Sequence, residues 1–146
     1  MSAERNGQER YKMERFLEKP CDPKSFSPLT LAFIGDCVFE LFVREKLVCD
    51  GNCPVHTLHQ RSVKCVCCTA QAADCAVLAP LLTEEETAVM RRGRNSHTNH
   101  VPKNASVANY HAATGLECLF GYLYLQGKMD RLRILFQALV DADSQS

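Results

Sequence analysis

The sequence predicts an all-helical domain of about five to six helices. Apolar residues recur at the three- and four-residue spacing of helices, whereas no stretch shows the alternation of apolar and polar residues that marks a strand. Capping residues, prolines and glycines divide this pattern into segments of helical length. With 146 residues, 46% of them hydrophobic, the chain can bury enough apolar surface to fold as one domain without disulfide bonds.

Residues 1–24 are predicted to be a flexible N-terminal segment with a short turn or helix at 11–18. The first ten residues are polar, and Pro20 and Pro23 keep the following chain extended. The folded domain is therefore expected to occupy residues 25–142.

Two long helices are predicted in the first half of this domain. The first runs from Pro28, with Ser27 as its cap, to about Val48. The second runs from Val55 to about Leu78 and stops before a proline. Both carry core candidates at helical spacing, among them Leu31, Ile34, Val38, Leu41, Phe42, Val63 and Leu78.

The second half is predicted to hold three more helices and one polar loop. Thr83 and Glu86 have the spacing of a capping box, which predicts a helix start at this point. Gly127 marks the end of a long apolar helix. The helices are expected over about 83–92, 105–125 and 128–142, and the loop over 93–104.

Charge and cysteine content narrow the class of protein. The 17 Lys and Arg residues cancel the 17 Asp and Glu residues, so any electrostatic site must be local. Nine is an odd number of cysteines and no apolar leader precedes them, so we expect free, mostly buried thiols in a reducing compartment. No apolar run reaches the length of a membrane span without a charge or a breaker, so we expect a soluble protein.

Isolated acids occur in two helices that are otherwise apolar. Asp36 and Glu40 lie in LAFIGDCVFELFV (31–43), and Glu117 is the only charged residue between Lys103 and Lys128. A buried carboxylate without a partner is costly or becomes protonated. Each acid therefore requires a base, hydrogen-bond donors or a cation.

Glycines flank both acids, at positions 35, 115 and 121. Glycine inside a helix costs about 0.5 to 1 kcal/mol relative to alanine, and close packing of two helices is a common reason for it. If the two helices cross at their glycines, Asp36 and Glu117 can share a Mg²⁺ ion and form a site for hydrolysis. The alternative is that the two acids are unrelated and each is held by an arginine or a backbone group. Glu40 either supports this site from behind or faces solvent.

The segment RRGRNSHTNHVPKN (91–104) is basic, and no acid lies between Glu86 and Glu117. Forked arginine donors and neutral amides suit the phosphate backbone of a nucleic acid. The alternative is that these residues only complement the C-terminal end of the preceding helix. The candidate binding residues are Arg91, Arg92, Arg94, Asn95, Lys103 and Asn104.

A second metal site is conceivable in a cysteine- and histidine-rich segment. Cys49, Cys53, His56 and His59 have the pattern C-x3-C-x2-H-x2-H, which supplies four zinc-type ligands. Both histidines, however, fall at the start of a predicted helix. Zinc is therefore the weaker interpretation of this segment.

Four ordered blocks carry a family resemblance. They are LAFIGDCVFELFVR (31–44), LHQRSVKCVCCTAQA (58–72), LTEEETAVMRRGRN (82–95) and YHAATGLECLFGYLYLQG (110–127), the last followed by Arg131 and Leu132. Together they resemble Mini-ribonuclease III, the short, helical branch of the ribonuclease III superfamily. The resemblance covers about residues 28–135.

This resemblance implies a ribonuclease III-type catalytic domain at 25–142, with no separate double-stranded-RNA-binding domain. Such a domain works as a homodimer and cuts double-stranded RNA with Mg²⁺, for which Mn²⁺ can substitute, leaving 5′-phosphate and 3′-hydroxyl ends. The implied role is maturation of precursor large-subunit (23S) ribosomal RNA in the cytoplasm. A ribosomal protein or the pre-ribosome is an implied further partner.

The resemblance also assigns residues. Asp36 and Glu117 match the catalytic, metal-binding acids, which implies in-line attack by a metal-activated water, and 91–104 matches a segment that grips RNA. Larger enzymes of the superfamily carry two more acids, where this chain has Ala32 and Thr114. Thr114 could hold a metal-bound water but adds no charge, so the number of metal ions stays open.

The rival function is a non-catalytic RNA-binding or ribosome-associated module on the same fold. Such a module gains nothing from the cost of burying Asp36 and Glu117 in apolar helices. The presence of both acids therefore favours the enzyme.

Overall fold

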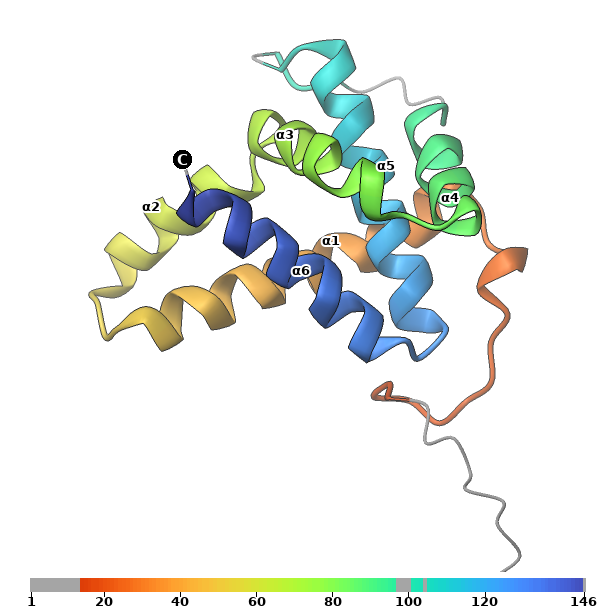
Figure 1. The fold of residues 1–146 in the computed structure, drawn as a ribbon, viewed down its shortest axis with the longest axis horizontal. Coiled ribbons are helices and arrows are strands. Elements are labelled where there is room, and N and C mark those ends of the chain that lie inside the picture. The colour runs from red at the N-terminus through yellow and green to blue at the C-terminus, as the bar shows by residue number, and fades with distance from the viewer. Residues whose placement is uncertain (1–13, 97–100, 104, 146) are drawn as a thin grey trace, which may run out of the picture.

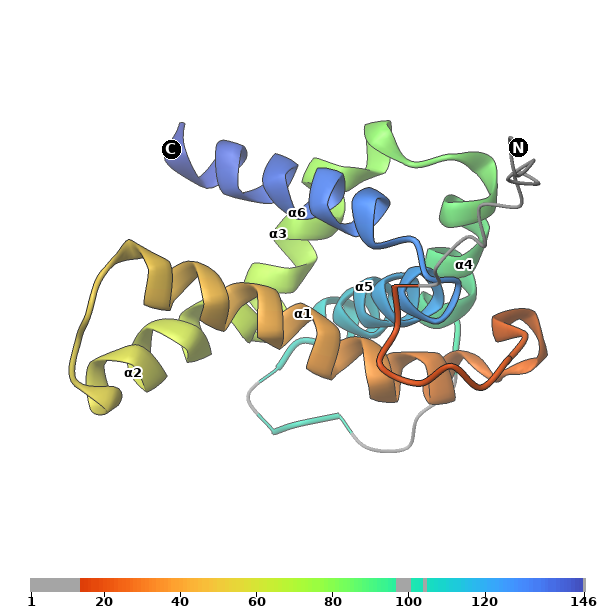
Figure 2. The ribbon, with the colours of Figure 1, turned by 90° about the horizontal axis from the view of Figure 1, so that it is seen from below.

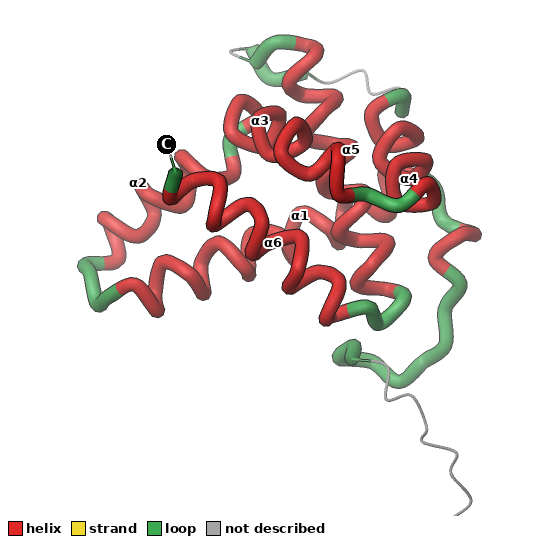
Figure 3. The backbone as a smooth tube through the Cα atoms, viewed as in Figure 1, coloured by secondary structure: helices red, strands yellow, loops and turns green. Residues whose placement is uncertain are grey.

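The computed structural model describes residues 14–96, 101–103 and 105–145. These residues form six α-helices, two short 3-10 helices and no strand, so the predicted fold class is confirmed (Figures 1 and 3). The α-helices are α1 (Pro28–Asp50), α2 (Val55–Val66), α3 (Cys68–Leu78), α4 (Glu84–Arg94), α5 (Val107–Leu125) and α6 (Met129–Ser144). The 3-10 helices are η1 (Pro23–Ser25) and η2 (Ala79–Leu81).

Helix α5 is the centre of the domain. It packs against α1, α3, α4 and α6, which lie around it in Figures 1 and 2. Its residues from Ala113 to Leu123 are buried except Glu117. A helix that is apolar on all sides is stable only when neighbours cover all of it. The sequence of α5 therefore requires this central position.

Aromatic rings join α1, α5 and α6. Phe39 meets Phe120 edge to face, with ring centroids 5.2 Å apart, and Phe42 stacks on Phe136 at 5.0 Å. Such ring pairs add about 0.5 to 1.5 kcal/mol beyond the burial of their surface. This cluster joins the middle of α1 to α5 and α6.

Several predicted helix ends are confirmed. Ser27 caps α1 by accepting a hydrogen bond from Thr30 N, and Thr83 caps α4. Thr83 and Glu86 form the predicted capping box, with the two bonds at 3.0 and 3.1 Å. Local capping chemistry therefore decided where these two helices begin.

The single long helix predicted from Val55 to Leu78 is wrong. The chain bends by 54° between α2 and α3, because Cys67 takes an extended conformation with ψ 156°. The bend lets α2 pack on α1 while α3 packs on α5 and α6. Packing against two different partners outweighed the continuous helical pattern.

Three smaller expectations also differ. No helix is present in residues 14–18, which hold the described part of the expected helix at 11–18, and Phe16 there is 87% exposed. Leu41 and Val63, expected in the core, are exposed as well. A short amphipathic segment that does not pack against the rest of the domain is unstable as a helix.

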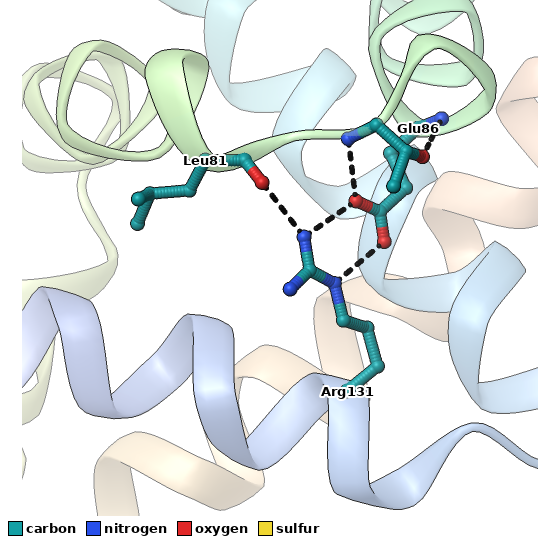
Figure 4. Close-up of polar contacts among 4 residues, drawn as sticks. Leu81, Glu86 and Arg131 are labelled. Atoms are coloured by element: carbon teal, nitrogen blue, oxygen red, sulfur yellow. Dashed lines mark hydrogen bonds and ion pairs between the residues drawn. The ribbon is translucent and has the colours of Figure 1, made fainter.

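A partly buried ion pair, with the carboxylate inside the core, ties α4 to α6 (Figure 4). Glu86 is 5% exposed and accepts hydrogen bonds from Thr83 N and from both Nε and Nη2 of Arg131, the latter two at 2.9 and 2.8 Å. Arg131 Nη2 also donates to the carbonyl oxygen of Leu81 at 2.8 Å. Both carboxylate oxygens of Glu86 therefore have donors, which is the condition for burying such a pair.

In the described part of the chain, no single helix has both the length and the apolar character needed to cross a membrane. The bent pair Val55–Val66 and Cys68–Leu81 meets the length and composition together.

Candidate functional site

Helices α1 and α5 cross with their backbones in direct contact. A Cβ atom on Gly35 would lie 1.6 Å from the carbonyl oxygen of Glu117, and one on Gly121 would lie 2.0 Å from the carbonyl oxygen of Leu31. Only glycine fits at either position. The crossing that the glycines suggested is therefore confirmed, and it places Asp36, the neighbour of Gly35, beside Glu117.

Gly115 takes part in a different crossing. A Cβ atom there would lie 2.7 Å from the carbonyl oxygen of Met90, and one on Gly93 would lie 2.9 Å from the Cα of Gly115. Helix α5 thus approaches α1 through Gly121 and α4 through Gly115. Glu117 lies between the two contacts along the helix.

Both acids have pKa values above those of ordinary carboxyl groups. Burial, and then the negative charge of Asp36, raise the pKa of Glu117 to about 7, although the nearby amide of Gln71 lowers it. The expectation that Asp36 is buried is wrong, because the residue is exposed. Its remaining burial, followed by the charge of Glu40, raises its pKa. No cationic side chain pairs with either acid among the described residues. The site therefore presents two carboxyl groups that lack a counter-charge.

Gln71, on α3, is a residue of this site that the sequence interpretation missed. Its side chain is 1% exposed, and its amide lies close enough to lower the pKa of Glu117. The atom Nε2 nevertheless has no well-formed hydrogen bond to any described residue. The available signal in the sequence was a single amide within the run of small residues TAQAA, 69–73.

Glu40 and Thr114 lie near the acids but have other partners. Glu40 Oε1 accepts from Arg44 Nη2 at 2.8 Å, one turn along α1, in a partly exposed pair. Thr114 is buried, and its hydroxyl donates to the carbonyl oxygen of Tyr110 at 3.0 Å. Glu40 thus has its own counter-charge, and Thr114 is tied to the backbone of its own helix.

The basic end of α4 is held beside the middle of α5. A Cβ atom on Gly93 would lie 2.7 Å from the Cβ of Cys118, so the last turn of α4 sits against the turn that carries Glu117. Burial raises the pKa of Cys118 to about 11, and the charge of Arg92 opposes this rise. The candidate residues Arg91, Arg92, Arg94, Asn95 and Lys103 are all exposed. Asn104, His97 and His100 lie outside the described residues.

The cysteine- and histidine-rich segment does not form a ligand set. Cys49 lies in the last turn of α1, Cys53 lies in the connection to α2, and His56 and His59 are exposed on α2. Nowhere in residues 14–96, 101–103 and 105–145 do three His, Cys, Asp or Glu side chains gather as a possible metal site. All nine cysteines are free thiols, as expected, but only Cys75 and Cys118 are buried. The expectation of mostly buried thiols is wrong.

Comparisons with known proteins agree with this architecture. The family model described as "Ribonuclease III domain" matches residues 29–128. The structure of protein FN1578 from Fusobacterium nucleatum superposes with a TM-score of 0.74 at 27% identity, covering 82% of this chain and 96% of that one. The six-helix fold and its two paired acids therefore define a ribonuclease III-type domain.

Two curated relatives are more similar in sequence. "Mini-ribonuclease 3" of Symbiobacterium thermophilum is 48% identical over 120 residues, which cover 82% of this chain and 92% of the relative. "Mini-ribonuclease 3" of Thermoanaerobacter sp. is 47% identical over 116 residues, covering 80% and 82%. The chain belongs to the Mini-ribonuclease III branch of the ribonuclease III family and is an endoribonuclease.

Proposed function

We propose that the protein is a Mg²⁺-dependent endoribonuclease that cuts double-stranded RNA at the site formed by Asp36 and Glu117. The observation that carries the proposal is the α1–α5 crossing, which brings two acids together and provides no cation for them. Hydrolysis would leave 5′-phosphate and 3′-hydroxyl ends.

The donor set fits Mg²⁺. This ion binds proteins through one or two carboxylates and keeps several of its waters, so two acids suffice. Mn²⁺, which also accepts oxygen ligands, can take its place. When bound, such an ion supplies Lewis-acid activation of the phosphodiester and of the attacking water.

The protein's own residues prepare this site. Glu117 must be ionised to serve as a ligand, and with its pKa raised to about 7 it gives up its proton when a cation binds. The exposed arginines Arg91, Arg92 and Arg94, with Asn95 and Lys103, lie at the end of α4 that contacts α5 next to Glu117. They are suited to hold RNA phosphates near the scissile bond.

A homodimer fits the exposed face of α1. Phe33 is 82% exposed, and Leu29 and Leu41 are 45% and 58% exposed. Leu29 and Phe33 lie about one turn apart, and Leu41 lies two turns further along and about 80° around the helix from Phe33. Monomeric proteins rarely expose such a group of large apolar residues. Asp36 lies beside this group, so pairing through α1 would bring two sites together on one duplex, one for each strand.

We further propose precursor 23S ribosomal RNA as the substrate and the cytoplasm as the location. A helical domain of this size should bind duplex RNA mainly through its shape and phosphate backbone, and therefore in a salt-dependent way. A ribosomal protein or the pre-ribosome is then a reasonable partner to present the substrate. The rival role, a non-catalytic RNA-binding module, leaves the unpaired charges of Asp36 and Glu117 without purpose.

Cleavage of a duplex RNA tests the catalytic assignment. Wild type should cut with Mg²⁺ and stop with EDTA, whereas Asp36→Asn and Glu117→Gln should each lose about 10³-fold or more in rate, because each removes an anionic ligand. Circular dichroism should show that both variants remain folded. Equal cutting by all three proteins, or no cutting by folded wild type, would refute the assignment.

RNA binding by the end of α4 is tested separately in EDTA. Arg91→Ala and Arg94→Ala should weaken duplex binding and reduce the slope of log affinity against log salt by about 1 each. Lys128→Ala, an exposed cation beyond the other end of α5, is the matched control and should bind as wild type does. If affinity depends on salt in the same way for wild type, both arginine variants and Lys128→Ala, the end of α4 does not bind RNA.

A further inference from the structure

The buried amide of Gln71 is a polar group at the site that the proposed function has not used. It is 1% exposed, and Nε2 has no well-formed hydrogen bond to any described residue. Leaving a buried amide donor without a partner costs about 1 to 3 kcal/mol. A group with this cost at a functional site calls for an explanation.

The helix that carries Gln71 is firmly held against α5. The Sγ of Cys75, one turn after Gln71, donates to the carbonyl oxygen of Ala112 on α5 at 3.2 Å. Residues four apart share a helix face, so Gln71 faces α5 as well, where its amide is near the carboxyl group of Glu117. The amide of Gln71 therefore lies at the contact between α3 and α5, next to Glu117.

The chemistry of an amide suits this position. An arginine or lysine here would neutralise Glu117 and compete with a metal cation for it, whereas the Nε2 group of glutamine donates a hydrogen bond and adds no charge. Being almost fully buried, Gln71 has no access to the open side on which a cation and its waters would lie. Hydrogen bonds in unliganded sites are often poorly aligned and become well formed on binding.

We propose that Gln71 is a positioning residue whose amide orients the carboxylate of Glu117 toward Asp36 for binding a divalent cation. This proposal rests on the proposed metal site and adds a residue from a third helix to it. Replacing residues that hold a metal ligand in place typically costs about 10- to 100-fold in metal affinity. Gln71 thus raises affinity for the cation without contacting it.

Mn²⁺ binding in the absence of RNA tests this role. Mn²⁺ broadens the NMR signals of nearby backbone amides, here those around Asp36 and Glu117, even when it binds weakly. Gln71→Met, which keeps the volume and removes the donor, should need about 10-fold more Mn²⁺ for half-maximal broadening. Its thermal stability should match or exceed that of wild type, because an unpaired buried amide is removed. A purely structural role would instead lower stability and leave the Mn²⁺ titration unchanged.

Ser62→Ala is the matched control. Ser62 is also buried and polar, but its hydroxyl donates to the carbonyl oxygen of His59 within its own helix. Its Mn²⁺ titration should equal that of wild type. Gln71→Asn, whose amide is one methylene too short, should also bind Mn²⁺ more weakly, and it replaces Gln71→Met if that variant does not fold.

The outcomes separate the two proposals. If wild type shows local broadening and Gln71→Met or Gln71→Asn gives the same Mn²⁺ titration as wild type, only the proposed role of Gln71 is overturned. Absence of local broadening in wild type, together with absence of cleavage, overturns the metal site and the role of Gln71 with it.

Discussion

Packing removes two glutamates, Glu86 and Glu117, largely from water, and their pKa values shift in opposite directions. Burial raises the pKa of Glu86, but hydrogen bonds from Arg131 and Thr83 outweigh it, so that the pKa lies below its ordinary value. Burial also raises the pKa of Glu117, the charge of Asp36 adds to it, and the amide of Gln71 opposes it only in part, which leaves the pKa at about 7. The fold supplies Glu86 with a counter-charge and supplies Glu117 with none among the described residues, so Glu117 keeps its proton to a higher pH.

The difference separates a structural acid from a functional one. Glu86 joins α4 to α6 through donors on both carboxylate oxygens, and it has no capacity left for a ligand. Glu117 can still bind a cation, because no cationic side chain in the described part of the chain pairs with it. A perturbed carboxyl without a counter-charge is a good indicator of a functional site.

The largest expected effect comes from breaking the pair at Glu86. Arg131→Met leaves Glu86 buried without its cation, so the free energy of unfolding should fall by about 3 kcal/mol. Urea unfolding of the purified protein measures this. Arg133→Met is the control on the same helix, since Arg133 pairs only with exposed or partly exposed acids, and its change should stay within about 0.5 kcal/mol. A similar small loss for both variants would contradict the structural role of Glu86.

Replacing Glu117 should raise the free energy of unfolding at neutral to alkaline pH, whereas replacing Arg131 should lower it. Its pKa is about 7 in the folded protein and 4.5 for the unperturbed group, so between these values the folded state keeps a proton that the unfolded state has lost. Wild-type stability therefore falls as pH rises from 4.5 to 7, and Glu117→Gln does not share this fall. The variant should be more stable by about 2 kcal/mol at pH 8, somewhat less than the full pKa difference because water screens part of the charge.

Urea unfolding of wild type and Glu117→Gln at pH 5 and pH 8 checks this sign. The two proteins should be nearly equal at pH 5 and differ at pH 8. A Glu117→Gln variant that is less stable than wild type at pH 8 would show that Glu117, like Glu86, has a stabilising partner.

The smallest effect is expected at Glu40, which lies near Asp36 but pairs with Arg44. Glu40→Gln should change the free energy of unfolding by at most about 0.5 kcal/mol, because the pair is partly exposed. Its Mg²⁺-dependent cleavage should remain near the wild-type rate, in contrast to Glu117→Gln. Loss of cleavage as large as that of Glu117→Gln would make Glu40 part of the site after all.

Sequence patterns predicted most helices and part of the site. Caps at Ser27 and Thr83 and the all-apolar α5 are properties of short segments, so they could be read directly. The glycines suggested the crossing of α1 and α5 but could not prove it, because a glycine does not reveal which helix approaches it. The bend at Cys67 was missed, since both halves have a helical pattern and only their different packing partners separate them.

By itself, the sequence determined the helical class, the helix caps and the resemblance to the Mini-ribonuclease III branch, because these depend on neighbouring residues and on ordered motifs. Only the tertiary structure decided that Glu86 has a cationic partner and that Glu117 has none among the described residues and so can bind a ligand. Arg131 reaches Glu86 from 45 residues away, and Gln71 reaches Glu117 from another helix. The energy of a buried charge depends on the groups that packing brings around it, and distant groups meet only when the chain has folded.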